Sequence, residues 1–482
     1  MRFQKILLIL LFILASARWA KGSAFAINEL GVRAMGMGGA FAAIADDGSA
    51  IFYNPAGIAF QEGKPLESDM LAVIGLFRFF PSNPPPGEIV PSQGFSGLTR
   101  PHFIPIGGLY MTRPITPKLT FGFGVFVPFG LESNYENFHD SDPAVTKYPA
   151  RFAGDRAALQ TYWFQPTVAY RINPNNSVAL GIAYVHTHIF LEESILNPLT
   201  DGKTFGKAFA STIFPTVDPT LAAASIARLL PEGRSRAAAT ANTAAFNLGF
   251  MHRFQDSKTN IGLNWRSAVV NHLHGRDDFS FLPGAALPQF LPKGTTMNTL
   301  FPSQAIKGTF TEPASYTVGV SNSAFWNSTI DVDFEIQDFR RFKDFPINFS
   351  KTGKDIATPA EQRLVFDFHN SYVFKVGIEK SLNSTMQVRM GYSFDRSPVP
   401  DKSVSALFPD SSRNSFTIGM SRMRGNIELS AYYQAMFFAD RVTNVSANAN
   451  QFTNGDYSNF AHLVGLGMRI FPGGRPKKGD KQ

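Results

Sequence analysis

The stretch that decides the fold is TIDVDFEIQ, at residues 329–337. Successive side chains of a β-strand point to opposite faces, so this pattern places every apolar residue on one face and every acidic residue on the other. A strand with one lipid-compatible face and one charged face suits a barrel wall between membrane and water. The apolar face comprises Ile330, Val332, Phe334 and Ile336, and the polar face comprises Asp331, Asp333, Glu335 and Gln337.

The same alternation recurs along the chain in long runs. At 367–379, for example, Phe368 and Tyr372 fall on the apolar face, whereas Asp367 and His369 fall on the polar face. Strands of soluble sheets usually hold about five or six residues, but a membrane-crossing strand needs about nine to eleven. The runs predict an all-β chain of fourteen antiparallel strands, an even number that lets a single-chain bacterial barrel close. Their ranges are 67–79, 100–113, 118–129, 156–172, 176–192, 241–255, 258–275, 304–322, 326–342, 363–382, 384–395, 412–423, 426–439 and 460–471.

The composition agrees with a barrel. Mean hydropathy is -0.06, and downstream of the N-terminus no apolar stretch is long enough for a transmembrane helix. Alternating strands average to neutral hydropathy, because outward apolar and inward polar residues cancel. Phenylalanine is abundant, with 47 residues against 13 tyrosines and 4 tryptophans, and it offers apolar area without a polar atom to satisfy. We therefore expect a lipid-facing or lipid-handling surface.

The first residues predict export to the outer membrane of a bacterium. Arg2 and Lys5 precede an apolar run and then small residues, which is the layout of a secretory signal peptide over residues 1–22. The apolar run is shorter than the roughly 18 to 20 residues of a membrane-spanning helix, so we expect cleavage between Ala20 and Ala24 rather than an uncleaved anchor. The chain has no cysteine, so neither disulfides nor thiolate chemistry are expected.

The sequence lacks the features expected of several functional classes. The net charge of +8 is spread along the chain except for a basic tail at 473–482, so no nucleic-acid partner is expected. No Gly-x-Ser-x-Gly elbow, P-loop or zincin motif is present, which argues against an enzyme and assigns no cofactor. The acidic face described above would suit acid–base chemistry or Ca²⁺, and the pairs His186 with His188 and His272 with His274 would suit a metal. A polar lumen and interface-level histidines account for both more simply, so no metal site is assigned.

Short and long connections alternate, which gives the barrel a direction. Short turns such as 173–176 and 255–258 would face the periplasm, and longer inserts would face outside. The longest insert, 193–240, is expected to be partly helical, because Asp218 and Pro219 supply a helix start before an apolar stripe. That helix would either brace the barrel mouth or form part of an apolar capture groove. The candidate capture residues are Leu221, Ile226, Leu229 and Leu230 of the helix, with Phe205, Phe209 and Phe214 before it.

Residues 23–65, between the signal and the predicted barrel at 66–472, are rich in glycine and alanine and lack strand alternation. Such a segment can fold compactly, either as a plug in the lumen or as a periplasmic tail, and its composition leaves both alternatives open. It contains the runs SAFAINEL at 23–30, GMGGAF at 36–41, ADD at 45–47 and NPAG at 54–57.

These runs resemble the N-terminus of the FadL-type family of long-chain fatty acid outer-membrane transporters. VPFGL at 127–131, YSFDRSPVPDKSVSALFP at 392–409 and DSSR at 410–413 resemble later family motifs, so the resemblance covers most of the mature chain. It implies a fourteen-stranded transmembrane β-barrel whose N-terminal hatch, at 23–65, lies inside the lumen, with a lateral opening at an inward kink of the third strand. The corresponding hatch and gating residues are Phe25, Asn28, Glu29, Asp46, Asp47, Asn54, Pro55, Ala56 and Gly57, and the opening maps to Val125, Phe126, Val127 and Pro128. Proline cannot donate a ladder hydrogen bond, so Pro128 would either part the wall or end the strand.

The expected function is passive, ligand-gated diffusion of hydrophobic molecules, in the first place long-chain fatty acids. A fatty acid needs apolar capture outside, an apolar pocket inside and a cation for its carboxylate. Inward Arg266 and Arg389 are candidate cations, although each would also suit pairing with lumenal acids. The alternatives are uptake of aromatic hydrocarbons by the same fold and a non-transporting adhesin or structural barrel.

The expected partners are the hydrophobic ligand, outer-membrane lipid and the barrel assembly machinery, and the protein is expected to be a monomer. The basic tail after Phe471 departs from barrels that end on an aromatic residue, which puts terminal recognition by that machinery in doubt.

Overall fold

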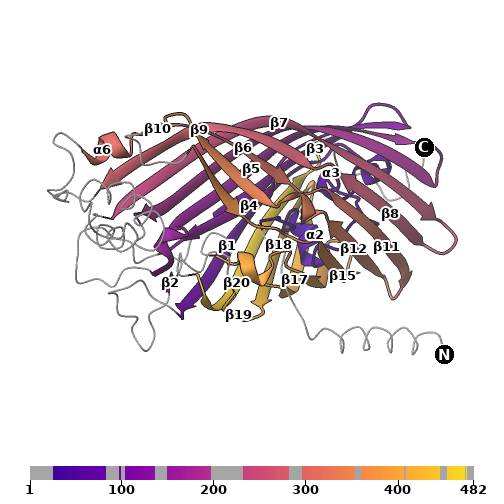
Figure 1. The fold of residues 1–482 in the computed structure, drawn as a ribbon. Coiled ribbons are helices and arrows are strands. Elements are labelled where there is room, and N and C mark those ends of the chain that lie inside the picture. Colours follow the sequence, from indigo (N-terminus) through magenta and orange to yellow (C-terminus); the bar gives the residue numbers. More distant parts are fainter. Residues whose placement is uncertain are drawn as a thin grey trace, which may run out of the picture.

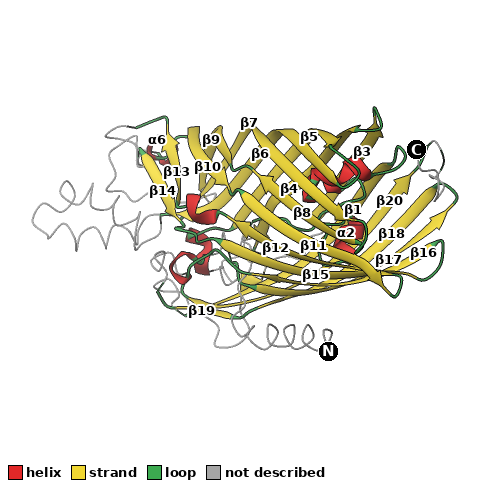
Figure 2. Ribbon diagram, turned by 90° about the vertical axis from the view of Figure 1, so that its right-hand side faces the viewer, coloured by secondary structure: helices red, strands yellow, loops and turns green. Residues whose placement is uncertain are grey.

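The computed structural model describes residues 25–82, 97–98, 104–135, 149–196, 232–281, 296–352, 360–405, 409–445, 453–472 and 474. These residues form one antiparallel barrel that surrounds an N-terminal segment with short helices (Figures 1 and 2). The predicted signal peptide, the predicted loop helix with its capture residues, and nearly all of the basic tail lie outside the described residues.

Fourteen strands make up the wall of the described barrel, and four of them are interrupted part-way. The interrupted strands are the pairs β8 (Thr259–Arg266) with β9 (Val269–Phe281), β10 (Gln304–Glu312) with β11 (Ser315–Phe325), β12 (Ser328–Gln337) with β13 (Asp344–Phe349), and β14 (Glu361–Val365) with β15 (Ser371–Ser381). The continuous strands are β1 (Leu66–Pro81), β3 (Ile104–Pro114), β4 (Leu119–Asn134), β5 (Arg156–Arg171), β6 (Asn176–Ile195), β7 (Gly233–Phe254), β16 (Met386–Asp395), β17 (Arg413–Arg424), β18 (Ile427–Phe438) and β20 (Gly455–Ile470). Two short strands, β2 (Gly97–Leu98) and β19 (Arg441–Thr443), extend the wall.

The barrel is closed by the pairing of its first and last strands. β1 pairs with β20 from Leu66↔Ile470 to Pro81↔Gly455, and its other edge pairs with β3. Every other wall strand pairs with its neighbours in chain order, as an up-and-down barrel requires. The predicted fold class and number of strands are therefore confirmed.

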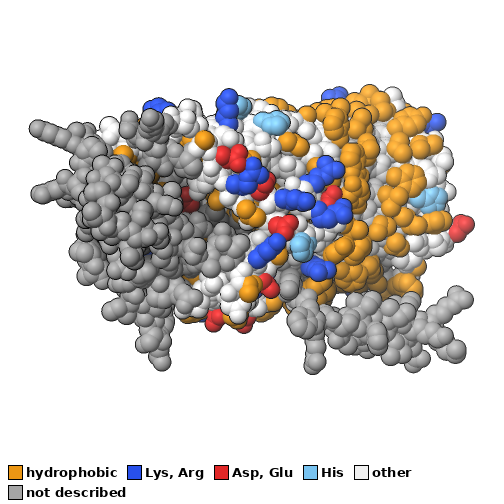
Figure 3. Space-filling model, viewed as in Figure 1, with side chains coloured by type: hydrophobic (Ala, Val, Ile, Leu, Met, Phe, Trp, Pro, Cys, Tyr) orange, Lys and Arg blue, Asp and Glu red, His pale blue; other side chains and the backbone are white. Residues whose placement is uncertain are grey.

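The two faces of the wall differ as the alternation predicts. Outward apolar side chains such as Leu180, Phe416 and Leu466 are exposed, and such residues form a belt on the half of the barrel near the short turns (Figure 3). The acidic face of β12 points inward and is buried. Phe368 is a correction: it was expected on the outward face, but it is buried in the interior because the wall is interrupted at 366–370.

The N-terminal segment lies in the lumen and supplies three short helices. They are α2 (Val32–Gly36), α3 (Ala50–Tyr53) and the 3-10 helix η1 (Pro55–Phe60). Four further short helices join strands: η2 (Pro149–Phe152), α6 (Met297–Leu300), η3 (Phe339–Arg341) and η4 (Asp401–Ser403). In the part of the chain that the structure describes, no helix is both long enough and apolar enough to cross a membrane.

Inward glycines of the wall make room for this segment, which we call the hatch. A Cβ atom at Gly262 would lie 2.0 Å from the carbonyl oxygen of Ala42, and one at Gly391 would lie 2.1 Å from the backbone nitrogen of Gly38. Side chains at these positions would collide with hatch backbone, so the hatch and the wall are fitted to each other at backbone level.

Candidate functional site

The first described residues of the hatch, Phe25–Ile27, form its tip, which ends in a cluster of aromatic rings. The side chain of Phe25 is 0% exposed. Its ring centroid lies 5.1–6.1 Å from those of four other rings, at angles that range from tilted to edge-on. We call this ring and those packed with it the aromatic cluster; all are buried except Phe129, which is partly buried: Phe25, Phe129, Phe310, Phe339, Phe342, Phe366 and Phe368.

The tip also pairs with the wall, at the edge of β4. The pairing of β3 with β4 runs from Pro114↔Thr120 to Leu109↔Val125 and stops there, although both strands continue. Beyond that point the hatch meets β4: the N–H of Ile27 donates to the carbonyl oxygen of Pro128 at 2.8 Å, and the N–H of Gly130 donates to that of Phe25 at 2.9 Å. The tip thus takes the position of a neighbouring strand on this part of β4.

β4 is irregular at the residues singled out from the sequence. Its register with β5 shifts between Phe126 and Phe129, so Val127 and Pro128 have no partner in the ladder. β4 then continues to Asn134, so the alternative that Pro128 merely ends the strand is wrong.

The NPAG run fixes the body of the hatch. The side chain of Asn54 accepts a hydrogen bond from the backbone N–H of Ala56, where it caps η1, and it donates to the carbonyl oxygens of Ala42 at 2.8 Å and Phe250 at 3.0 Å. Pro55 occupies the first turn of η1, where its missing N–H costs nothing. A Cβ atom at Gly57 would lie 1.9 Å from the carbonyl oxygen of Ala45, so only glycine fits there.

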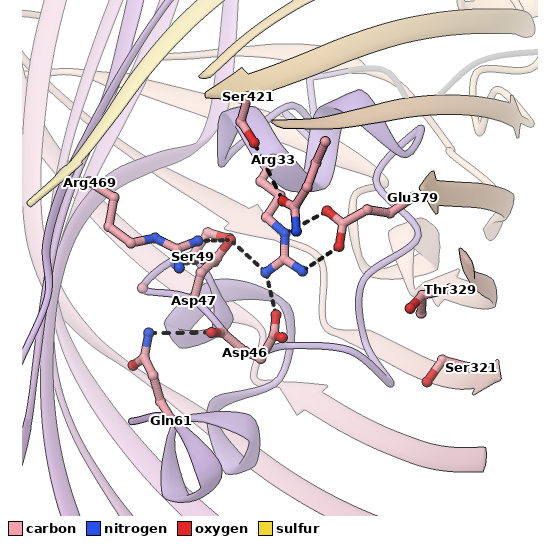
Figure 4. A network of polar contacts seen from close by, with 12 residues as sticks. Arg33, Asp46, Asp47, Ser49, Gln61, Ser321, Thr329, Glu379, Ser421 and Arg469 are labelled. Atoms are coloured by element: carbon pink, nitrogen blue, oxygen red, sulfur yellow. Dashed lines mark hydrogen bonds and ion pairs between the residues drawn. The ribbon is translucent and has the colours of Figure 1, made fainter. Parts of the chain in front are cut away.

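An ionic network joins the hatch body to the wall (Figure 4). The guanidinium of Arg33 in α2 bonds both carboxylate oxygens of Glu379 in β15, each at 2.8 Å, and also bonds Asp46 of the hatch. Asp47 pairs with Arg469 of β20 at 3.6 Å. Burial alone would lower the pKa of Arg33, but Asp46 and Glu379 raise it well above its usual value. The guanidinium therefore stays protonated.

Two further hatch residues singled out from the sequence lie between the tip and this network. Asn28 accepts a hydrogen bond from the side chain of Gln337 at 3.1 Å, and Glu29 pairs with Arg413 of β17 at 3.5 Å. Burial raises the pKa of Glu29, and the Arg413 guanidinium only partly opposes this.

Both candidate carboxylate partners are buried in ion pairs with the wall. Arg266 pairs with Glu335 at 3.0 Å, and its guanidinium lies 3.9 Å from the ring centroid of Phe52; its Nη1 atom has no hydrogen-bond partner among the described residues. Arg389 pairs with Glu379 at 2.6 Å and also donates to Ser421.

Comparison with known proteins assigns this chain to one family. Residues 13–470 match the family model described as outer membrane protein transport protein (OMPP1/FadL/TodX). The chain belongs to this family. As a member of the OMPP1/FadL/TodX family, it is an outer-membrane transport protein for hydrophobic compounds, and the expectation that it is not an enzyme is confirmed.

Individual relatives of this OMPP1/FadL/TodX member are distant but full-length. A protein of Neisseria meningitidis serogroup B named as an outer membrane protein, NMB0088, is 24% identical over 463 residues, which are 92% of this chain and 93% of the relative. The crystal structure of a Pseudomonas aeruginosa FadL homologue has a TM-score of 0.75 at 14% identity and covers 93% of this chain and 100% of its own. That of the Pseudomonas putida toluene transporter TodX has a TM-score of 0.68 at 15% identity and covers 92% and 99%. At these identities the solved structures support the fold alone.

Some contributors to the site in this family member were missed in the sequence. Arg33 and Glu379 form the central hatch-to-wall contact, and Phe339, Phe342 and Phe366 enclose the tip. One signal was available: glycines at inward positions of the predicted strands, such as Gly262 and Gly391, mark where the hatch backbone approaches the wall.

Proposed function

We propose that the protein admits hydrophobic compounds by passive, ligand-gated diffusion: the cargo displaces the hatch tip from the aromatic cluster and leaves sideways through the wall between β3 and β4. One observation carries this proposal. The tip occupies the edge of β4 at the place where the pairing with β3 stops. Moving three residues of backbone would therefore uncover a passage through the wall without unfolding any strand.

The hatch body argues against a straight path through the lumen. Its contacts with the wall include the Arg33–Glu379 ion pair, and the backbone N–H groups of Phe41 and Ala42 both donate to Asp333, at 2.8 and 2.9 Å. Breaking a buried ion pair by removing one partner is costly, and passage through the lumen would separate several such contacts at once. A sideways exit above the body leaves all of them in place.

The irregularity at Val127 and Pro128 supports the same route. A proline in a sheet cannot donate to a neighbouring strand, so β3 gains less from pairing with β4 beyond this point. Of the candidate opening residues, Val125 is the last one that pairs with β3, and Phe126, Val127 and Pro128 lie beyond that pairing.

The aromatic cluster favours an uncharged cargo such as an aromatic hydrocarbon. Rings that pack edge-on around Phe25 would accept another ring in its place, and the cluster itself contributes no charge. Long-chain fatty acids remain the second candidate, favoured by the unpartnered Nη1 atom of Arg266. Relatives of this fold include proteins named as a toluene transporter and a monoaromatic hydrocarbon channel, as well as a FadL homologue.

Removing Pro128 alone tests the route. The register with β5 advances three residues on β4, from Phe126 to Phe129, against two on β5, from Trp163 to Thr161, so deletion of one residue removes the irregularity and keeps the inward and outward alternation on both sides of it. We expect uptake of labelled toluene to fall to the level of cells that lack the protein, while the barrel still shows its heat-dependent gel shift. Pro166→Ala, at an outward position of the regular strand β5, is the matched control and should leave uptake unchanged. Normal uptake by the deletion variant would overturn the lateral route.

The cargo is tested with the same cells. If the cargo is uncharged, Arg266→Met should leave toluene uptake intact and no fatty acid should be taken up through the protein. Uptake of a labelled fatty acid that Arg266→Met abolishes would establish the second candidate instead. A barrel that admits neither compound would support the adhesin or structural alternative.

A further inference from the structure

The outer surface of the wall carries a band of polar side chains directly beyond the apolar belt, on the side of the long loops. The outward apolar residues of β6 end with Tyr184, and Val270 is outward and apolar at the start of β9. Two outward histidines follow on each strand: His186 and His188 on β6, and His272 and His274 on β9. Histidine, lysine and arginine side chains lie on this part of the wall (Figure 3). The band is therefore at the level where the hydrocarbon of the membrane ends.

The strand register aligns part of this band into one row across β5, β6, β7, β9, β10 and β13. On β7, Thr240 lies opposite His188 on one side and opposite His274 on the other. On β10, Lys307 lies opposite His274. We call the outward residues of this line the polar row: Gln160, His188, Thr240, His274, Lys307 and Asn348. Every member can donate a hydrogen bond, and none carries a carboxylate.

The centre of the polar row is a pair of donors without an acceptor. Residues directly opposite each other in an antiparallel pair have Cβ atoms about 4.5–5.5 Å apart. The side chains of His274 and Lys307 therefore lie next to each other, and both are exposed. Neither side chain forms a hydrogen bond or an ion pair in the part of the chain that the structure describes. An ammonium and an imidazole N–H can both donate to one anionic acceptor placed between them.

Carboxylates around the polar row are paired with arginines rather than with the row. The pairs are Asp278 with Arg276 at 2.7 Å, Glu192 with Arg236 at 3.1 Å, Glu361 with Arg363 at 2.7 Å and Glu132 with Arg156 at 3.5 Å. Each of these acids is thus matched by a cation of its own. Lys307 leaves this part of the outer surface with an excess of positive charge, which favours an anionic partner.

A metal ion is a poorer account of the histidines in this band. A structural metal site needs about four ligands around one point, and a catalytic site about three. Among the residues that the structure describes, no group of three or more histidines, cysteines and carboxylates could hold a metal ion. His188 and His274 are separated by the whole of β7. The histidines therefore supply donors along a line.

We infer that the polar row binds the phosphorylated headgroup of a lipid in the outer leaflet of the membrane. The phosphate lies against Lys307 and His274, and the acyl chains lie on the apolar belt. Lipid phosphates are found at the edge of the hydrocarbon region, which is the level of the row, and they accept charge-assisted hydrogen bonds from lysine. The leaflet is the outer one because the long loops of such barrels are extracellular. This lipid site goes beyond the proposed transport function and does not depend on which compound the barrel admits.

The polar row also reaches the candidate lateral opening. Its first member, Gln160, lies opposite Gly130 of β4, two residues from Pro128. A lipid headgroup held along the row therefore sets the height of Pro128 in the membrane, at the boundary between headgroups and acyl chains.

Two lipids with the same acyl chains test the inference: dioleoyl phosphatidic acid, which carries a phosphate, and dioleoylglycerol, which does not. Binding of each lipid to the full-length protein in detergent micelles is measured by native mass spectrometry over a range of lipid concentrations. We expect the phosphatidic acid to bind at least about tenfold more tightly, which corresponds to roughly 1.4 kcal/mol. Equal affinity for the two lipids would overturn the inference.

Variants of the polar row locate the site. His274→Gln combined with Lys307→Gln should weaken binding of the phosphatidic acid by about tenfold and leave binding of dioleoylglycerol unchanged. Lys351→Gln combined with His369→Gln is the matched control, because it removes the same two types of side chain from exposed positions outside the row. The heat-dependent gel shift confirms that both variants fold. A preference for phosphatidic acid that persists in the first variant, or that falls equally in the control, would overturn the assignment.

Inorganic phosphate separates a lipid site from a site for the free anion. The acyl chains of a lipid add contacts with the apolar belt, so inorganic phosphate at the same concentration should not displace the phosphatidic acid. Displacement by inorganic phosphate, lost in the variant of the polar row, would make the free anion the ligand and overturn the assignment to a lipid.

Discussion

The two ends of the hatch are held by opposite kinds of interaction. The body is held by buried charges and side-chain-to-backbone hydrogen bonds, for example Arg33 with Glu379, and Asn54 with the backbone of β7. The tip is held by ring packing around Phe25 and by two backbone hydrogen bonds to β4. Aromatic packing has no obligatory partner, whereas a buried charge has one.

This difference suggests which part of the hatch moves. A hydrophobic ligand can replace the contacts that Phe25 makes with the other rings of the aromatic cluster, because it too presents an apolar surface to them. It offers nothing to the carboxylates and guanidinium groups around the body. We therefore expect the body to act as a fixed plug and the tip as the gate.

Breaking the ion pairs that hold the hatch body to the wall should have the largest effect on stability. Glu379→Leu removes the shared acceptor of Arg33 and Arg389 and leaves two buried guanidinium groups without it, at a cost of about 4 kcal/mol. We expect a lower thermal midpoint of the barrel and greater sensitivity of cells to large hydrophilic antibiotics. Glu361→Leu, which breaks an exposed pair with Arg363, is the control and should change neither property. An unchanged midpoint in the Glu379 variant would show that the network does not hold the body.

Removing the ring packing that holds the hatch tip should have a smaller effect on stability, confined to the tip. Phe25→Ala removes a fully buried ring, at a local cost of about 3 kcal/mol, while the contacts of the body remain. We expect faster protease cleavage near the N-terminus and a thermal midpoint close to that of the parent protein. Phe164→Ala, at an outward position of β5, should alter neither the cleavage rate nor the midpoint. A large fall in the midpoint of the Phe25 variant would mean that tip and body unfold together.

Disturbing the fit between the hatch body and the wall should cost less than either change above and should leave the tip unaffected. Gly262→Ala places a methyl group 2.0 Å from the carbonyl oxygen of Ala42, and the overpacking should cost about 2 kcal/mol. The thermal midpoint measures this cost. Gly107→Ala, whose nearest neighbour would be the carbonyl oxygen of Asp69 at 3.2 Å, is the comparison. Equal midpoints for the two variants would contradict the close fit.

The smallest expected effect is a dependence on pH at the junction of tip and body. Burial raises the pKa of Glu29, so its contribution to stability is complete below the ordinary pKa of a glutamate and is lost as pH rises through the raised value. The thermal midpoint of the parent protein should therefore fall relative to that of Glu29→Gln as the pH is raised from acid to neutral. A parent midpoint that rises relative to the variant over this interval would reverse the sign and contradict the assignment.

The strands of the wall could be predicted from the sequence, because the alternation of apolar and polar residues that identifies a strand lies within the strand itself. TIDVDFEIQ alternates without interruption, and β12 occupies Ser328–Gln337. The interruptions could not be predicted in this way. Apolar residues at 366–368 continue the appearance of a strand, but Asp367 adopts a positive φ of 48°, which turns the chain and brings Phe368 inward.

The candidate site depends on contacts between residues that are distant in sequence. Arg33 is a single arginine among small residues, and its partner Glu379 lies 346 positions away. The resemblance to the FadL-type family supplied the position of the hatch, and the structure confirms that the segment lies in the lumen. The roles given to Phe25, Pro128 and the other gating residues stay predictions.

The seam between β1 and β20 constrains how the molecule is assembled. The hatch is the first described part of the chain, and β20 is the last strand of the wall. Because β1 joins directly onto the hatch and pairs with β20 along its whole length, the ring is completed only when β20 is in place. The hatch precedes every wall strand in the chain but is enclosed only at this last step, so the inward glycines of the wall must meet the hatch backbone before the ring closes. A hatch that folds too slowly would be sealed outside its own barrel.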